Sequence, residues 1–415
     1  MSYNLCVLGL GYIGLPTASI FAARGIKVLG VDVVPRVVET INRGQIHIEE
    51  PDLDGLVRAA VESGNLRAGL QPAAAQTFIV AVPTPFKATP TNPKAPDLAC
   101  VELATRSIAP VVAAGNLIIL ESTSPVGTTE LMRDWLFDEL SKMRPTEVAT
   151  LRSSLLFAHC PERVLPGQML KELVANDRIV GGLTPAAAQA AQDLYRTVCV
   201  GEIVLTDART AEMCKLTENA SRDVGIAFAN ELSLVCERLG IDVWELINLA
   251  NRHPRVKILQ PGPGVGGHCI AVDPWFIVDA APDLARLIRT AREVNDSKPH
   301  YVIERVKACA ERFQFPVIAC LGLAFKADVD DLRESPAMDI VQHLVENQVG
   351  RVIVSEPHIS ELPAPLKGQV ELLSLGEAVA AADVVVLLVN HQEFLHFNLG
   401  NLEGKAVVDT RGVWR

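Results

Sequence analysis

The glycine pattern near the N-terminus is the feature that most constrains how this chain can fold. Residues 9–14 read Gly-Leu-Gly-Tyr-Ile-Gly, a GxGxxG motif between an apolar run at residues 4–9 and a helical pattern at residues 13–25. A second apolar run, residues 26–32, ends at Asp32. This spacing predicts a strand, a tight turn, a helix and a parallel second strand within about 30 residues, as at the start of a dinucleotide-binding α/β domain.

The three glycines have different predicted tasks in binding a dinucleotide. The first makes the tight turn, the second lets a pyrophosphate approach the backbone, and the third allows close packing of helix and strand. The helix N-terminus supplies N–H donors. The acidic residue would accept hydrogen bonds from the ribose hydroxyls and repel a 2′-phosphate, which favours NAD over NADP. The predicted cofactor contacts in this unit are Gly9, Gly11, Tyr12, Ile13, Gly14 and Asp32.

The rest of the chain predicts two α/β blocks and a helical segment between them. The remaining strands of the first block are expected at residues 77–82, 117–121, 155–159 and 178–181, and those of the second at residues 317–323, 351–354, 384–389 and 406–409. We expect two Rossmann-like doubly wound domains joined by a long helical connector, because apolar runs alternate with helical patterns. Residues 141–153 read as a polar surface connection.

The connector begins with an unusually long helical pattern. Asp207 can cap this helix and Gly240 can end it. At 1.5 Å per residue the helix would be about 50 Å long, enough to link two domains and carry a dimer surface. The predicted division is an N-terminal NAD-binding domain at residues 1–205, a connector and dimerisation region at residues 206–313, and a C-terminal α/β domain at residues 314–415.

Composition narrows the classes of function. The net charge of −11 argues against a nucleic-acid partner or an anionic membrane surface. We expect neither a signal peptide nor a transmembrane helix, because the N-terminal apolar run is broken by glycines and no 18-residue stretch lacks charges and turn signals. The nine cysteines are scattered without a CxxC pair, which indicates free thiols in a reducing compartment, the cytoplasm. No spacing typical of metal ligands occurs.

One cysteine lies in a distinctive segment, residues 260–276, which contains four glycines and three prolines. Cys269 follows His268 and precedes Asp273 by four residues. A thiol beside a nicotinamide cofactor can capture an aldehyde as a thiohemiacetal, which can then give up a second hydride. The glycines leave room for close approach of a ligand, and Lys215 or a helix N-terminus could lower the thiol pKa. The alternative is an inert structural cysteine.

Further polar residues follow predicted strands or share a helix face, and each has a structural alternative. Thr84 and Thr123 could contact the cofactor or a water, or belong to a turn and a helix cap. Glu162 is a base if its carboxyl is desolvated, and otherwise a solvated glutamate. Lys215 and Asn219, four residues apart on one helix face, could stabilise an oxyanion, whereas a solvated lysine is the alternative.

The second α/β block has its own cationic segment. Residues 322–336 follow its first predicted strand and include Lys326 and Arg333. Cations at the carboxyl end of a strand suit a diphosphate, and the alternative is a solvated loop.

Taken together, these motifs resemble the nucleotide-sugar 6-dehydrogenases over nearly the whole chain and in the same order. Within that family, residues 161–167 and 261–276 are most similar to the enzymes that act on UDP-N-acetyl-D-mannosamine. UDP-glucose enzymes usually carry Pro-Glu-Phe-Leu and Gly-Gly-x-Cys-Phe/Leu-Pro-Lys-Asp segments. This chain has Arg163 in place of that Phe, Ala271-Val272 in place of Pro-Lys, and Pro166 where many have a second glutamate.

The resemblance implies a role for each matched residue. Cys269 would be the nucleophile, Lys215 and Asn219 would hold the oxyanion, and Asp273, Thr123 and Glu162 would position or activate water. Arg252 matches an arginine that in this family reaches the substrate of the other subunit of a dimer. Lys326 would bind the UDP-sugar, which makes residues 314–415 the UDP-sugar-binding domain, and Arg333 the cofactor phosphates. The remaining implied contacts are Thr84 with the cofactor, and Arg163, His253, Arg255 and Gly266 with the substrate.

The resemblance therefore predicts oxidation of C6 of UDP-N-acetyl-D-mannosamine to the uronate, with two NAD reduced and a Cys269 thioester as intermediate. UDP-N-acetylglucosamine and UDP-glucose remain alternative substrates. More remote alternatives are a single-step hydroxyacid dehydrogenase, which needs no cysteine, and a non-enzymatic nucleotide-binding protein. The expected assembly is a homodimer or a higher homo-oligomer.

Overall fold

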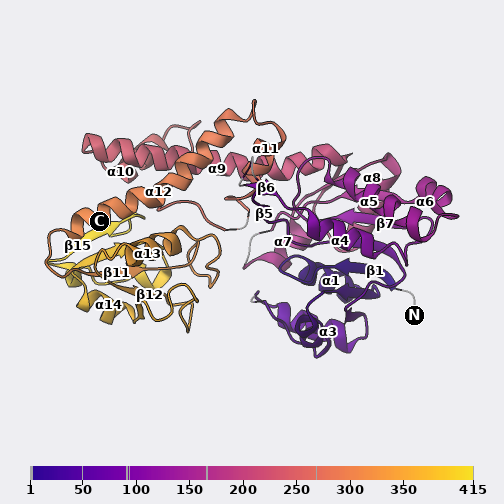
Figure 1. The fold of residues 1–415 in the computed structure, drawn as a ribbon, viewed down its shortest axis with the longest axis horizontal. Coiled ribbons are helices and arrows are strands. Elements are labelled where there is room, and N and C mark those ends of the chain that lie inside the picture. Colours follow the sequence, from indigo (N-terminus) through magenta and orange to yellow (C-terminus); the bar gives the residue numbers. More distant parts are fainter. Residues whose placement is uncertain are drawn as a thin grey trace. The chain divides into compact units, whose positions relative to one another are not determined.

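The computed structural model describes residues 3–48, 50–89, 92, 94–164, 167–267 and 269–414. The chain divides into two compact units, residues 1–218 and residues 219–415 (Figure 1). Helix α9 (Ala208–Leu239) runs through the boundary between them. Of the helices that the described residues form, none has the length and apolar character needed to cross a membrane.

The first unit is built on an eight-stranded sheet with the order β10-β9-β8-β7-β4-β1-β2-β3. Neighbouring strands are parallel except β8 and β9, which are antiparallel. All six strands predicted for this unit are present, whereas β3 and β10 were missed because they are short edge strands with partly exposed residues. The strands are β1 (Tyr3–Leu8), β2 (Val28–Val31), β3 (Leu66–Gly69), β4 (Ala75–Val80), β7 (Leu117–Leu120), β8 (Leu156–His159), β9 (Arg178–Gly182) and β10 (Ile203–Asp207).

Helices cover both faces of this sheet, as a doubly wound fold requires. Leu5 and Val7 of β1 pack in a core with α1 and α3, whereas Cys6 and Leu8 pack in a second core with α4 and α5. The expected polar connection at residues 141–153 is wrong in part, because α6 forms there and buries Leu151. The helices are α1 (Gly14–Ala23), α2 (Pro35–Asn42), α3 (Leu53–Glu62), α4 (Ala99–Ser107), α5 (Thr128–Met143), α6 (Val148–Ser154), α7 (Met169–Ala175) and α8 (Pro185–Tyr195); a small hairpin joins β5 (Phe86–Lys87) to β6 (Ala95–Pro96).

Helix α9 has the boundaries that its capping residues predict. The Asp207 carboxylate accepts a hydrogen bond from the backbone N–H of Thr210 at 2.9 Å. At the other end, Gly240 takes the left-handed conformation with φ +70°, where glycine is favoured. The sequence therefore specifies both ends of the helix locally.

The second unit contains a five-stranded parallel sheet with the order β13-β12-β11-β14-β15. Its two faces are also both covered: α13 packs on Ile318 and Cys320, and α14 packs on Ala319 and Leu321 (Figure 1). The predicted fold of two Rossmann-like domains is thus confirmed, and only the two-residue strand β13 was missed. The strands are β11 (Val317–Leu321), β12 (Arg351–Ser355), β13 (Glu371–Leu372), β14 (Val384–Leu387) and β15 (Ala406–Asp409); the helices are α10 (Val243–Ala250), α11 (Asp273–Ala280), α12 (Arg286–Ala310), α13 (Pro336–Glu346), α14 (Leu375–Ala381) and α15 (Gln392–Leu395).

Candidate active site

The glycine turn after β1 has the shape of a dinucleotide cradle. A Cβ atom on Gly9 would lie 2.4 Å from the carbonyl oxygen of Ala81, and one on Gly14 would lie 1.8 Å from the carbonyl oxygen of Gly9. Both glycines are therefore required by the packing of the turn itself. At Gly11 no atom of the described residues lies within 4 Å of such an atom. This open backbone is where a pyrophosphate can approach, so the turn fits NAD.

Asp32 is fixed at the end of β2 by the turn that it faces. One carboxylate oxygen accepts the N–H of Leu10 at 3.0 Å, and the other accepts the N–H of Val34 at 2.9 Å. Since a carboxylate has about four acceptor sites, Asp32 keeps the capacity to accept ribose hydroxyls. Tyr12 and Ile13 are half-buried in the same turn.

Thr84 and Thr123, which follow the neighbouring strands β4 and β7, are brought together by the sheet. The Thr84 hydroxyl donates to the carbonyl oxygen of Thr123 at 2.7 Å. Both side chains are half-buried. The pair therefore occupies the carboxyl edge of the sheet, where ligands bind in folds of this class.

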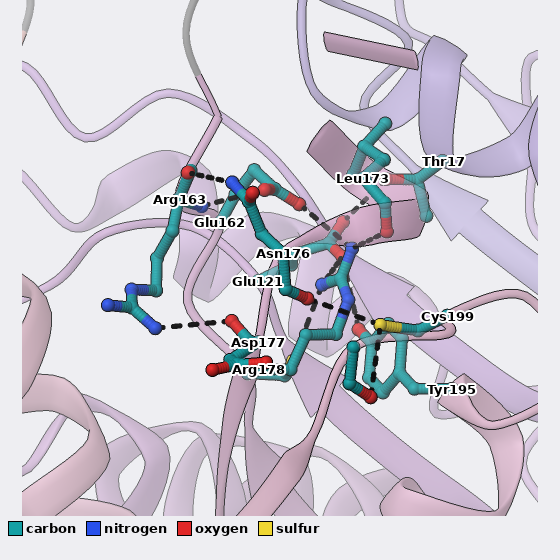
Figure 2. A network of polar contacts seen from close by, with 12 residues as sticks. Thr17, Glu121, Glu162, Arg163, Leu173, Asn176, Asp177, Arg178, Tyr195 and Cys199 are labelled. Atoms are coloured by element: carbon teal, nitrogen blue, oxygen red, sulfur yellow. Dashed lines mark hydrogen bonds and ion pairs between the residues drawn. The ribbon is translucent and has the colours of Figure 1, made fainter. Parts of the chain in front are cut away.

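Glu162 belongs to a buried polar network at the same edge (Figure 2). One of its carboxylate oxygens accepts the N–H of Arg163 at 2.6 Å, and the other lies 3.4 Å from the Arg178 guanidinium. A second buried glutamate, Glu121, lies 4.0 Å from Arg178 and accepts hydroxyl hydrogen bonds from Thr17 and Tyr195 at 3.1 Å each. The solvated alternative for Glu162 is thus wrong, since its side chain is 8% exposed.

The buried position of Glu121 leads to a prediction on stability. Burial, together with the negative charge of Glu162, raises the pKa of Glu121 from 4.5 to about 7. Between these values the folded chain keeps a proton that the unfolded chain releases, so the free energy of unfolding falls as pH rises through this window. We expect Glu121→Gln to remove this contribution, which makes the variant gain roughly 3 kcal/mol relative to wild type from pH 4 to pH 8. Urea unfolding of both proteins at several pH values measures the difference, and parallel pH curves would refute it.

Lys215 lies half-buried on α9, three residues after Glu212, which anchors this helix. The buried Glu212 carboxylate accepts the backbone N–H groups of Gly127 and Thr129 at 2.6 Å and 2.8 Å. It therefore caps α5 through its orphan N–H donors. This contact fixes the rotation of α9 against the sheet and so sets the direction in which Lys215 extends.

Arg163 is committed to an ion pair within the first unit. Its guanidinium lies 2.7 Å from the Glu218 carboxylate on α9 and also donates to the carbonyl oxygen of Asp177 at 3.2 Å. About a third of its side chain stays exposed. Its predicted contact with substrate remains a prediction.

In the second unit, the structure brings together two of the residues predicted around the thiol. The Asn219 amide donates to the Asp273 carboxylate at 2.5 Å, and Asp273 is 2% exposed at the start of α11. Cys269 is exposed, and its carbonyl oxygen accepts the N–H of Asp273 at 2.8 Å. His268, like Pro166, lies outside the described residues.

Burial separates Cys269 from the structural thiols. Cys6, Cys160 and Cys320 are completely buried, and burial raises the pKa of each thiol to about 12. A thiol held in that state is a poor nucleophile, because the thiolate is the reactive form. The exposed Cys269 has access to a ligand that these three lack.

The glycines of residues 260–276, here called the cysteine loop, do not leave the room for a ligand that the sequence predicts. A Cβ atom on Gly264 would lie 2.9 Å from Pro336, one on Gly266 2.2 Å from the carbonyl oxygen of Glu334, and one on Gly267 2.9 Å from Phe325. The room that these glycines leave is filled by the chain itself. The cysteine loop thus packs directly on the segment that carries Lys326.

The Lys326 segment, residues 322–336, is held in place by the buried pair of Glu356 and His391. The Glu356 carboxylate accepts the N–H groups of Leu323 and Ala324 at 2.7 Å and 3.0 Å and lies 3.1 Å from a ring nitrogen of His391. The other ring nitrogen of His391 accepts the N–H of Asp328 at 2.9 Å. Lys326 therefore extends from a loop that is fixed on both sides.

These contacts also bear on metal binding. Among the described residues, Asp328, His358 and His391 place possible ligand atoms within 4.8 Å of one another. Both ring nitrogens of His391 are already engaged in the hydrogen bonds above, so this residue offers no ligand atom without breaking them. The set does not suit a metal ion.

The other predicted basic residues lie in two exposed places. Arg333 forms an ion pair with Asp331 at 2.7 Å on the Lys326 segment. Arg252, His253 and Arg255 are exposed beyond the end of α10. Their predicted ligand contacts remain predictions.

An open glycine turn followed by an acidic strand end is the NAD-binding arrangement of a dehydrogenase. A second Rossmann-like domain and an exposed cysteine on the loop before α11 accompany it. The chain belongs to the UDP-glucose/GDP-mannose dehydrogenase family. The NAD-binding domain of this family matches residues 3–199, its central domain residues 209–297, and its UDP-binding domain residues 319–415.

The names of similar proteins refer to two different sugars. The chain is 61% identical to an NDP-N-acetyl-D-galactosaminuronic acid dehydrogenase of Ralstonia nicotianae, with 99% of this chain and 96% of the relative covered. It is 55% identical to the UDP-N-acetyl-D-mannosamine dehydrogenase of Escherichia coli, with 99% of both covered. A solved UDP-D-ManNAc dehydrogenase from Pyrococcus horikoshii superposes with a TM-score of 0.88 at 38% identity, covering 100% of this chain and 96% of that one.

Proposed function

We propose that this chain oxidises C6 of a UDP-N-acetylhexosamine, UDP-N-acetyl-D-mannosamine, to the uronate with two NAD reduced. The observation that carries the proposal is the exposed Cys269 on a glycine-rich loop, next to the Asn219–Asp273 pair and packed on the Lys326 segment. A single oxidation needs no such thiol. The family membership supports NAD and a UDP-linked substrate.

In the proposed mechanism the residues of the chain act after the alcohol has become an aldehyde. NAD, held at Gly11 and Asp32, supplies the hydride acceptor for both oxidations. The Cys269 thiolate adds to the aldehyde carbon, and the resulting tetrahedral adduct has a hydride to give, which leaves a thioester. Asn219 donates one amide hydrogen to Asp273 and keeps a second for the oxyanion, beside the Lys215 ammonium.

Release of the product requires water. Asp273, Thr123 and Glu162 are proposed to position that water and to accept its proton as it attacks the thioester carbonyl, which frees the carboxylate and returns the thiol. Lys326 and Arg333 are proposed to bind the diphosphate of the UDP-sugar and of the cofactor, respectively. Because Cys269 must remain a thiol, we place the reaction in the cytoplasm, a reducing compartment.

A second candidate substrate is UDP-N-acetyl-D-galactosamine. The 61% identity to the Ralstonia enzyme, which is higher than the 55% to the Escherichia coli enzyme, favours it. The proposed chemistry at C6 is the same for either sugar, since the two differ only in ring configuration.

The test is the amount of NADH formed per molecule of sugar, with UDP-N-acetylmannosamine, UDP-N-acetylgalactosamine, UDP-N-acetylglucosamine and UDP-glucose run separately to completion. We expect two NADH from UDP-N-acetylmannosamine. Two from another of these sugars keeps the mechanism and replaces the substrate. One NADH would indicate a single-step dehydrogenase, and none from all four a binding protein.

We further propose a homodimer built on α9. Phe228, Val235 and Leu239 follow one another at 7 and 4 residues and are 52%, 46% and 65% exposed, so they form an apolar stripe on one helix face. A second copy of this stripe is the partner that would cover it. The exposed Arg252 is proposed to reach the substrate bound to the partner subunit.

The stripe predicts a change of oligomeric state. Phe228→Glu should convert the dimer to monomer in sedimentation analysis, because a charge would then have to be buried in the interface. Phe315→Glu is the matched control, since Phe315 is 83% exposed on the loop before β11 and lies outside the stripe. A monomeric wild type, or a Phe228→Glu protein that remains dimeric, contradicts the proposal.

A further inference from the structure

The one antiparallel pairing in the first sheet, between β8 and β9, brings an arginine to the proposed reaction site. Strand β9 pairs with β8 so that Gly182 lies opposite Ala158 and Gly181 opposite His159. Continued beyond β8, this register places Arg178 opposite Glu162. In a parallel arrangement the first residue of β9 would lie at the far edge of the sheet.

We infer that Arg178 is the positioning residue of Glu162: its guanidinium, held by Glu121 and Tyr195, fixes the direction of the Glu162 carboxylate beyond the end of β8. The inference deepens the proposed function and rests on it, because Glu162 is there assigned to the water that attacks the thioester.

The contacts of Arg178 fix its orientation from several directions (Figure 2). Besides the two carboxylates, the guanidinium donates to the carbonyl oxygen of Leu173 at 3.2 Å and lies 4.7 Å from the centre of the Tyr195 ring. The side chain is 7% exposed. An arginine enclosed in this way presents one terminal guanidinium nitrogen to Glu162 in a fixed direction.

Arg178 supplies the positive charge of this network. A buried carboxylate is costly unless a cation accompanies it, and Arg178 is the cation that contacts Glu162. Burial and the charge of Glu162 raise the pKa of Glu121 to about 7, so near neutral pH this second glutamate is charged only in part, and it is held by two hydroxyl groups.

Two contacts orient the Glu162 carboxylate without using all of its acceptor sites. Its two oxygens receive one N–H from Arg163 and the guanidinium contact, so further acceptor sites remain for a water molecule. Replacing Arg178 by lysine removes the planar guanidinium group but keeps the positive charge. This change should disturb the direction of the Glu162 carboxylate and slow turnover with little effect on ligand binding.

A double-mutant cycle tests the inference. Arg178→Lys should lower kcat by about 10- to 100-fold while the KM values for NAD and the UDP-sugar change less than about 2-fold. In a Glu162→Gln background, which has already lost the carboxylate, Arg178→Lys should lower kcat by no more than about 2-fold. Arg178→Gln is run through the same cycle, so that the comparison survives if the lysine variant does not fold.

The matched control is Arg106→Lys. Arg106 binds Glu102, Asp138 and Glu139 between α4 and α5, at a place with no proposed part in the reaction, and kcat should stay within about 2-fold. An equal loss of kcat from Arg178→Lys in both backgrounds, or a loss confined to KM, overturns the inference. If the wild type makes two NADH and the cycle is additive, the inference alone fails. A wild type that oxidises no UDP-sugar refutes the proposed function as well.

Discussion

A Cys269→Ser protein is expected to bind NAD as the wild type does and to lose turnover to the uronate by more than about 10³-fold. A serine hydroxyl is almost entirely protonated near neutral pH, whereas a thiol readily gives the nucleophilic thiolate. Without the tetrahedral adduct, the aldehyde has no suitable hydride for the second oxidation. The measurement is NADH per UDP-sugar in single-turnover and steady-state assays, together with NAD affinity by fluorescence.

Cys100→Ser is the matched control for this experiment. Cys100 is also exposed but lies at the start of α4, far along the chain from the glycine-rich loop. It should make two NADH at the wild-type rate. Four-electron oxidation at full rate by the Cys269→Ser protein would remove the thiol from the mechanism and return the single-step alternative.

Local patterns explain which parts of the fold could be predicted from the sequence. Continuous apolar runs marked the central strands β1, β4 and β11, because both faces of such strands are buried. Asp207 and Gly240 marked the ends of α9 for similarly local reasons. The edge strands β3 and β10 lack a strong pattern, since one side of each faces solvent.

The partners of the site residues could not be predicted, because they come together only through strand order. Glu162 was identified from its place after a strand, but its partner Arg178 depends on β9 being antiparallel. Neither Glu356 nor His391 belongs to a motif, although together they fix the Lys326 loop. A buried charge at a strand end was the only available signal, and a single sequence does not show burial.

The glycines of the cysteine loop show the opposite case, in which the motif was correctly noticed and its reason was not. A glycine-rich stretch is compatible with ligand access and with tight chain packing alike. Here Gly264, Gly266 and Gly267 are required by contacts with Phe325, Glu334 and Pro336. Sequence alone does not distinguish these two causes, because the contacting residues lie 58 to 72 positions further along the chain.

The glycine turn after β1 allows those two causes to be separated by experiment. Gly11→Ala should fold with wild-type stability, because the part of the chain that the structure describes has no atom within 4 Å of the added methyl group. It should bind NAD at least about 10-fold more weakly, because the methyl group occupies the path of the pyrophosphate. Gly14→Ala should instead lose about 1–3 kcal/mol of stability, since its methyl group would lie 1.8 Å from the Gly9 carbonyl oxygen.

Urea unfolding and NAD titration of the two variants measure both effects, with Gly55→Ala as control. An added methyl group on Gly55 would also lie more than 4 Å from every described neighbour, but Gly55 is on α3 and its substitution should leave NAD affinity unchanged. Unchanged NAD affinity in Gly11→Ala would mean that the cofactor does not approach this turn. A Gly14→Ala protein as stable as wild type would mean that α1 can shift away from β1 at little cost. We expect a stable Gly11→Ala protein that binds NAD weakly and a less stable Gly14→Ala protein. This combination arises only if Gly14 is needed for packing within the turn and Gly11 for the approach of the cofactor phosphates.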